Sequence, residues 1–232
     1  MMQEILTDPG TGYWDRTWGR MLKHQAMIAP SGKLMQLMLP FLPRGAQVLD
    51  LGCGEGRNTL YLARIGYQAI GLDISRKGVT ALANNLFEED VQAGVLVGDA
   101  GSIPLRDGSL HGILAHNLFD HVGRDLFHTA LASCWRVLVP GGILLMTLDA
   151  AAAIEHDPPT HYVGRDDHAV IFVKGPKRGL LFRPYRDEEL RELPALGWEI
   201  RRQEMSPRRA VILLLQKPNP TAAPPREQLQ SR

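Results

Sequence analysis

The sequence predicts an α/β protein with a doubly wound, mostly parallel sheet. Short apolar runs that read as strands alternate with helical segments from residue 47 to residue 149, a rhythm typical of parallel sheets covered by helices. A glycine-rich turn follows the first run, as in folds that bind a ligand at the carboxyl ends of their strands. Two apolar runs near the end of the chain are joined by a short turn, which predicts an antiparallel pair.

Each expected strand is a short apolar run, and each expected helix carries apolar residues at helical spacing with a start or stop signal. Ser75 is the expected N-cap of one helix, Gly66 ends another, and the Pro-Gly-Gly segment at 140–142 is expected to stop a third. The expected strands are 47–52, 67–73, 93–99, 110–117, 143–149, 198–205 and 209–217. The expected helices are 32–42, 57–66, 75–90, 124–139 and 186–197.

The segments outside this rhythm divide the chain into parts. Residues 1–44 are expected to form a helical extension, whose aromatic residues either anchor it to the core or make it a lid. Residues 45–217 form the expected main domain, with an insertion at about 150–186 that contains a hairpin over the carboxyl edge of the sheet. The Pro-rich, polar tail at 218–232 has the composition of a disordered segment.

Composition narrows the class of protein. The net charge is +1 with short basic clusters only, so a nucleic-acid-binding surface is not expected. Two cysteines give no disulfide framework and fit a reducing compartment. The first residues lack the pattern of a signal peptide, and the apolar runs are too short for a membrane span. We therefore expect a cytoplasmic protein, a monomer or homodimer, with no nucleic-acid or membrane partner.

The glycine-rich turn predicts the kind of ligand. Asp73, at the end of the second strand, lies about twenty residues after the glycines, the separation at which an acid accepts hydrogen bonds from two ribose hydroxyls. The dinucleotide pattern G-x-G-x-x-G fails, because Arg57 stands where its third glycine should fall. Asp50 and Glu55 in and beside the turn disfavour a pyrophosphate and suit a cation. The turn thus indicates a cationic nucleoside rather than a nicotinamide dinucleotide.

The segments "VLDLGCGEGRNTLYLA", "AIGLDIS", "GDAGSIPLRDGSLHGILAHNLFDHV" and "ALASCWRVLVPGGILLMTL" resemble, in order, class I S-adenosylmethionine (SAM)-dependent methyltransferases. The first segment is most similar to tellurite-resistance-type small-molecule methyltransferases. The resemblance implies a Rossmann-like fold with seven strands, the last of them antiparallel, and SAM as cofactor. Leu110-His111 replaces the Phe-Asp that the family often has there.

The resemblance also implies roles for individual residues. Asp73 would hold the ribose, Asp99 would accept from the adenine amine, and the other cofactor residues would surround the methionine, adenine and sulfonium. The cofactor residues are then Asp50, Gly52, Gly54, Gly56, Asp73, Ile74, Asp99, Ala100, His116 and Asn117. Candidate general bases are His116 and His121, although His121 also suits a packing role. Candidate acceptor-binding residues are Trp14, Trp18 and Tyr185.

Several alternatives stay open at this level. The segment from His156 to His168 is rich in histidine and aspartate, but it lacks a compact ligand spacing and cysteine, so no metal site is expected. The expected activity is methyl transfer to a small molecule by in-line displacement. The alternatives are methylation of protein or RNA, and a non-catalytic SAM-binding scaffold.

Overall fold

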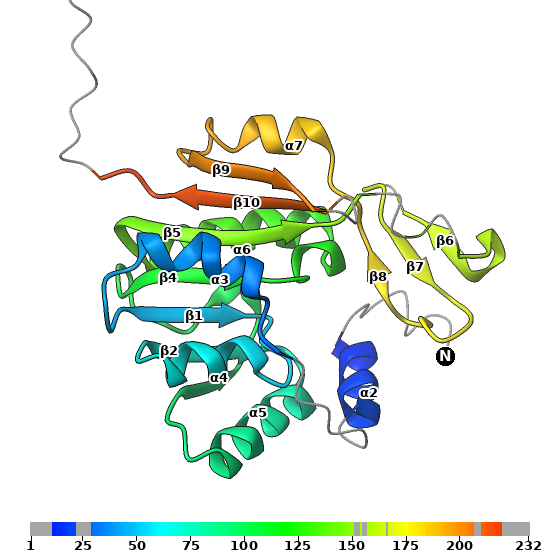
Figure 1. The fold of residues 1–232 in the computed structure, drawn as a ribbon. Helices are drawn as coiled ribbons and strands as arrows, with labels where there is room; N and C mark the ends of the chain where they lie inside the picture. The colour runs from blue at the N-terminus through cyan, green and yellow to red at the C-terminus, as the bar shows by residue number, and fades with distance from the viewer. Residues whose placement is uncertain are drawn as a thin grey trace, which may run out of the picture.

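A computed structural model of the chain describes residues 11–21, 29–150, 154, 157–165, 167–206 and 210–219. A seven-stranded sheet forms its centre, in the order β3-β2-β1-β4-β5-β10-β9 (Figure 1). The strands are β1 (Gln47–Leu51), β2 (Gln68–Asp73), β3 (Gly94–Val97), β4 (Leu110–Ala115), β5 (Leu138–Leu148), β9 (Glu199–Met205) and β10 (Val211–Gln216).

The sheet is parallel except at β10, which pairs antiparallel with both β5 and β9. The predicted fold class, with its antiparallel last strand, is therefore confirmed. In register, Asp50 of β1 lies between Gly71 of β2 and Leu114 of β4. From β1 the chain continues to β2 and β3 on one side, and from β4 it continues to β5 on the other side. The carboxyl ends of β1 and β4 therefore form the topological switch point where such folds bind ligands.

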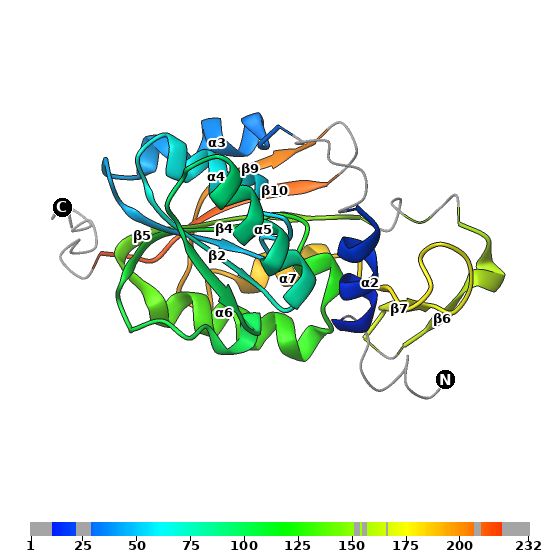
Figure 2. The same ribbon diagram turned by 90° about the horizontal axis from the view of Figure 1, so that it is seen from below.

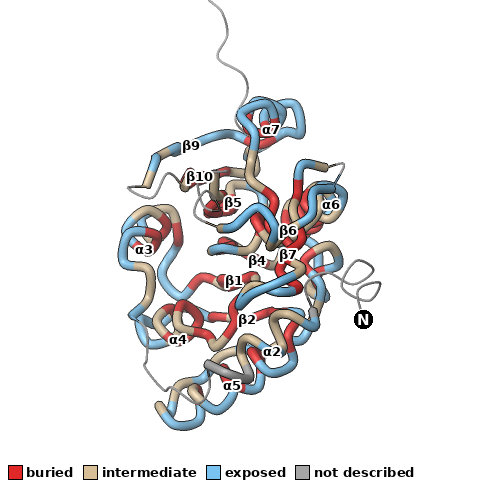
Figure 3. The backbone as a smooth tube through the Cα atoms, turned by 90° about the vertical axis from the view of Figure 1, so that its right-hand side faces the viewer, coloured by how far each residue is buried: buried red, intermediate tan, exposed pale blue. Residues whose placement is uncertain are grey.

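Helices cover both faces of the sheet (Figure 2). They are α3 (Gly32–Met38), α4 (Arg57–Arg64), α5 (Arg76–Glu88), α6 (Arg124–Val137) and α7 (Asp187–Glu192). Alternate residues of β1 serve the two faces: Val48 packs with α3 and α4, whereas Leu49 packs with α6 and α7. Because α3 contributes fully buried Met38 to this core, it belongs with the main domain. The edge strand β9 is exposed along most of its length (Figure 3).

Several helix ends differ from the prediction, and the helix expected over 186–197 already stops at Glu192. The helix expected over 32–42 stops at Met38, and a short 3-10 turn, η1 (Leu39–Phe41), follows it because Pro40 interrupts helical hydrogen bonding. The helix expected over 124–139 stops at Val137, and Leu138 already has extended backbone (φ −75°, ψ 138°). The Pro-Gly-Gly segment at 140–142 therefore lies inside β5 and does not stop the helix.

Two elements lie beyond the carboxyl ends of the parallel strands, toward which the arrowheads of β1 and β5 point in Figure 1. One is α2 (Thr11–Met21). The other is a three-stranded antiparallel sheet, called the inserted sheet here, formed by β6 (Tyr162–Gly164), β7 (Val170–Phe172) and β8 (Leu181–Phe182). The predicted hairpin is confirmed by the pairing of β7 with β8. The predicted disordered tail falls almost entirely outside the described residues.

Among the described residues, no helix has the length and apolar character needed to cross a membrane.

Gly56 and Gly66 flank α4 with nearly equal positive φ angles, 86° and 89°. A Cβ at Gly56 would lie 2.1 Å from Leu82 Cδ1, whereas nothing lies within 4 Å of one at Gly66. We expect Gly66→Ala to lower the free energy of unfolding by ~1 kcal/mol through backbone strain alone. Gly56→Ala should cost a further ~1–3 kcal/mol, because α5 must also move. Urea unfolding checks this, and equal losses in the two variants would contradict it.

Candidate functional site

A cavity of about 530 Å³ opens at the carboxyl ends of the parallel strands, under α2 and the inserted sheet. Its size is within the range of small-molecule sites. Most of the predicted cofactor residues lie on its wall: Gly52, Asp73, Ile74, Asp99, Ala100, His116 and Asn117. The predicted Asp50, Gly54 and Gly56 are not part of that wall. Both predicted catalytic histidines, His116 and His121, line the cavity.

The glycine turn and the end of β2 are tied together by the Asp73 carboxylate. Its Oδ2 accepts a hydrogen bond from Gly54 N at 2.9 Å, and its Oδ1 accepts one from Ser75 N at 2.8 Å. Burial raises the pKa of Asp73, and these backbone hydrogen bonds oppose that rise. A carboxylate has about four acceptor positions, so each oxygen can accept another hydrogen bond. Asp73 thus keeps acceptor capacity while it lines the cavity.

Asp50 supports the turn from below. Its Oδ2 accepts hydrogen bonds from Thr59 N at 3.0 Å and from Thr59 Oγ1 at 2.7 Å. Burial raises the pKa of Asp50 to about 6, against the lowering effect of the Thr59 hydrogen bonds. Asp50 therefore connects β1 to the first turn of α4.

The other wall, after β2 and β3, combines apolar and acidic groups. Ile74 keeps 38% of its surface exposed, and it lines the cavity together with Ala100. Asp99 Oδ1 accepts from Gly101 N at 2.7 Å, which fixes the carboxylate at the start of the short η2 (Ala100–Ser102). This part of the wall thus pairs an apolar surface with a fixed carboxylate.

At the end of β4 the backbone itself is unusual. Asn117 has a φ of 54°, a conformation that costs energy in residues other than glycine and is concentrated at functional sites. Thr147 Oγ1 holds it by accepting from Asn117 N at 2.9 Å and donating to Asn117 Oδ1 at 3.2 Å. This turn sends the chain across the cavity toward His121.

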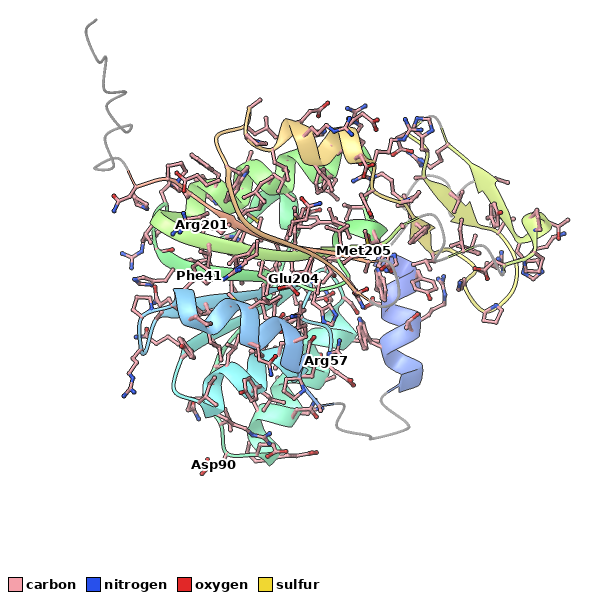
Figure 4. The ribbon with its side chains drawn as sticks, turned by 45° about the horizontal axis from the view of Figure 1, so that its top comes forward. Phe41, Arg57, Asp90, Arg201, Glu204 and Met205 are labelled. Atoms are coloured by element: carbon pink, nitrogen blue, oxygen red, sulfur yellow. The ribbon has the colours of Figure 1, made fainter. Side chains whose placement is uncertain are left out.

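His116 is held by an arginine. Arg57 Nη2 donates to His116 Nδ1 at 3.0 Å. Arg57 is the first residue of α4 and lies at the end of the sheet that is nearer to α2 (Figure 4). Burial, with a further contribution from the Arg57 charge, lowers the pKa of His116 to about 4. The imidazole is consequently neutral at physiological pH.

His121 belongs to η3 (Phe119–His121) and touches the inserted sheet. Its Nδ1 lies 3.0 Å from the carbonyl oxygen of Leu181 in β8, and its ring meets that of Trp14 edge-on, with centroids 5.0 Å apart. Burial lowers the pKa of His121 to about 4. Its neighbour Asp120 is buried, and Asp120 Oδ1 accepts from Asp149 N at 2.5 Å.

The helix α2 joins the core to the inserted sheet. Asp15 Oδ1 accepts from Ser75 Oγ at 2.6 Å, at the start of α5, and Arg16 Nη2 donates to Arg178 O at 3.3 Å. Trp14 and Trp18 face the cavity with their rings stacked at 6.2 Å. The Trp18 ring lies so close to the glycine turn that a Cβ at Gly54 would be 2.4 Å from it.

The predicted Tyr185 is not brought to the cavity. It packs at the edge of the main core, and its backbone N donates to Asp149 O at 3.1 Å. The wall instead includes Arg57, Arg165 and Leu181, which were not among the predicted site residues. Arg57 carried a usable signal, since it directly follows the last glycine of the turn. Arg165 and Leu181 carried none, because the path of the inserted segment depends on tertiary packing.

Among the residues that the structure describes, no group of three or more histidine, cysteine, aspartate or glutamate side chains is arranged to hold a metal ion. Two members of the histidine-rich segment, His156 and Asp166, lie outside the described residues. Both cysteines, Cys53 and Cys134, are buried and unpaired with each other.

The Arg57–His116 contact predicts a pKa change. Arg57→Met removes both the charge and the donor, so the pKa of His116 should rise by ~1 unit from about 4 and stay below 6.5, because burial remains. Histidine NMR titration measures it. The matched control is Arg64→Met, which removes a cation from the same helix that pairs with Glu89 instead. A His116 pKa that moves equally in both variants would refute the assignment.

Asp120 predicts a pH dependence of stability. Burial raises its pKa from 3.8 to about 7, so from about pH 4 to pH 7 the folded chain holds a proton that the unfolded chain has released. The free energy of unfolding therefore falls across this window as pH rises. Asp120→Asn removes the proton-binding group and its pH dependence. The free energy of unfolding of the variant, minus that of the parent, should therefore increase from pH 5 to pH 8 in urea unfolding. A pH-independent difference would contradict the buried carboxyl.

Comparison with known proteins agrees with this geometry. Residues 49–146 match a family model described as a methyltransferase domain. A ribosomal RNA small subunit methyltransferase C from Alcanivorax borkumensis is 28% identical over 199 residues, which cover 78% of this chain and 58% of that protein. The chain thus spans less than two thirds of that relative's length.

Solved structures share the fold at low identity. A TehB-like SAM-dependent methyltransferase from Corynebacterium glutamicum has a TM-score of 0.60 at 19% identity, covering 89% of this chain and 97% of that one. A 1,6-didemethyltoxoflavin-N1-methyltransferase from Burkholderia thailandensis, solved with bound 1,6-didemethyltoxoflavin and S-adenosylhomocysteine, has a TM-score of 0.65 at 19% identity, covering 88% of this chain and 84% of that one. Residues 49–146 thus match a methyltransferase domain, and the chain shares its fold with SAM-dependent methyltransferases of known structure.

Proposed function

We propose that this protein transfers a methyl group from SAM to a small-molecule acceptor by in-line displacement. The observation that carries the proposal is the single cavity that joins the Asp73 carboxylate, the glycine turn and the two histidines under α2. When bound, SAM supplies a methyl group activated by the sulfonium charge. The protein's part is to bind, orient and shield the reactants, which is a proximity contribution.

The side chains present fit this cofactor. The remaining acceptor positions of Asp73 suit the two ribose hydroxyls, and the apolar surface of Ile74 and Ala100 suits the adenine ring. The Asp99 carboxylate can accept a hydrogen bond from the adenine amine. Gly52 has a φ of 76° and lets the backbone approach the methionine part closely. The acids Asp50 and Asp73 lie behind and beside this turn, so the local charge favours a cation.

We assign α2, within residues 1–44, the role of a lid. Its Trp14 and Trp18 side chains cover the cavity, and Asp15 latches it to Ser75. A closed, dry site strengthens orientation and electrostatic effects at the reacting atoms. The main domain is then 45–217 together with α3, and residues of about 150–186 form the second half of the cover.

A small acceptor is favoured over RNA or protein. The cavity is covered from two sides by α2 and the inserted sheet, and the net charge of +1 offers no basic stripe for a polyanion. The similarity to an enzyme named for ribosomal RNA keeps RNA as the second candidate. Methyl-labelled SAM offered with ribosomal RNA and with a metabolite panel separates the two, because label in precipitable RNA alone would refute the small-molecule proposal.

The cofactor proposal is tested by calorimetry with S-adenosylhomocysteine. Asp73→Asn should weaken binding ~10–100-fold, the loss expected when hydrogen bonds to a charged group are removed. The matched control is Asp107→Asn, which changes an exposed aspartate paired with Arg136 before β4, at the opposite edge of the sheet. Binding that is absent in the parent protein, or equal in Asp73→Asn, would overturn the proposal. Tight binding without turnover of any acceptor would favour a scaffold.

A further inference from the structure

The two histidines on the cavity wall have opposite hydrogen-bond partners. Arginine can only donate, so the Arg57 contact at 3.0 Å requires that Nδ1 of His116 is the unprotonated nitrogen. A backbone carbonyl can only accept, so the Leu181 contact at 3.0 Å requires that Nδ1 of His121 carries the proton. In neutral imidazoles the remaining nitrogen follows: Nε2 of His116 is a donor, and Nε2 of His121 is an acceptor.

We propose that Nε2 of His121 receives the proton of the methyl acceptor, that Nε2 of His116 donates a hydrogen bond in the same site, and that the inserted sheet fixes this division. The proposal rests on the methyltransferase function proposed above and deepens it by naming the acceptor class. That class is an aromatic or heteroaromatic ring bearing an O–H or N–H as the methylated group.

The surroundings of His121 select the acceptor's body. The Trp14 ring lies edge-on to the imidazole at 5.0 Å, and the ring of Phe182, which follows Leu181 in β8, lies 6.4 Å from the imidazole. Leu181 and Val122 add apolar wall beside them. Flat apolar rings pack well against such edges, whereas a highly charged chain would lose hydration there. Arg165 supplies the one cation near this end of the described wall.

The inserted sheet holds His121 from both sides. Leu181 O accepts from its ring, and Arg183 N donates to the carbonyl oxygen of the preceding Asp120 at 2.7 Å. The strand that supplies these contacts is itself anchored, because buried Arg183 pairs with buried Glu189 at 2.5 Å. The segment that carries no motif of its own thereby decides which imidazole nitrogen can accept a proton.

Methyl transfer needs only the acceptor, the sulfonium methyl group and His121, with no oxidant or reductant. A lone pair on the acceptor's oxygen or nitrogen forms the bond to the methyl carbon, and the carbon–sulfur bond breaks with its electron pair passing to sulfur. The acceptor's proton passes to His121 Nε2, so the positive charge of the sulfonium ends on the imidazolium. Because burial lowers the pKa of His121 to about 4, the imidazole is neutral at pH 7 before the reaction.

The tautomers are measured directly by ¹⁵N NMR of the full chain labelled at histidine, with S-adenosylhomocysteine added. We expect a protonated Nδ1 and a bare Nε2 at His121, and the reverse at His116. The opposite tautomer at His121 would overturn the proposal whatever the acceptor. Failure of S-adenosylhomocysteine to bind would instead count against the proposed function, because the tautomers can also be measured without it.

Phenol and anisole probe the acceptor side. Phenol can donate to His121 Nε2 and should shift its ¹⁵N signal, whereas anisole, which lacks the proton, should not. No phenol-specific shift at saturating phenol would overturn the acceptor class. His121→Asn keeps a donor for Leu181 O and removes Nε2, so it should abolish the phenol effect and lower kcat on any responding phenol ~10²–10⁴-fold. His121→Gln places an acceptor near the Nε2 position and should restore part of both, while S-adenosylhomocysteine binds equally to all three proteins.

Discussion

The structure depends on one buried carboxylate that does two tasks. Asp73 accepts hydrogen bonds from Gly54 N and Ser75 N, so it joins the glycine turn after β1 to the start of α5. It keeps acceptor capacity on the side that faces the cavity. The same group therefore holds the turn and, in the proposed function, offers its remaining acceptor positions to the cofactor.

Around that link, the cavity is assembled from two kinds of support. The half next to β1, β2 and β3 is built on the central sheet, because Gly52, Asp73 and Ile74 lie at or directly after the carboxyl ends of its strands. The half next to His121 depends on contacts between distant segments, α2 and the inserted sheet, through Trp14 and Leu181. A constant half for the cofactor and a variable half for the acceptor is how one fold can serve many acceptors.

The sequence predicted the half next to β1, β2 and β3 well and the other half poorly, for physical reasons. Alternating apolar runs and the glycine turn predict the strands, and Ser75 predicts its own cap, confirmed by its Oγ accepting from Gly78 N at 3.2 Å. These are local patterns. Tyr185 was expected at the site and lies away from it, whereas Leu181 enters through a backbone carbonyl that any residue could supply. Side-chain identity carries no signal for such a contact.

The position of α2 has a kinetic consequence. It is held to α5 through Asp15 and to the inserted sheet through Arg16, and its tryptophans lie over both halves of the cavity. In the proposed lid role, α2 would uncover the cofactor side and the acceptor side together. Loading and product release would then share one opening step, and the opening rate of a short amphipathic helix would set an upper limit on turnover, however fast the methyl group itself is transferred.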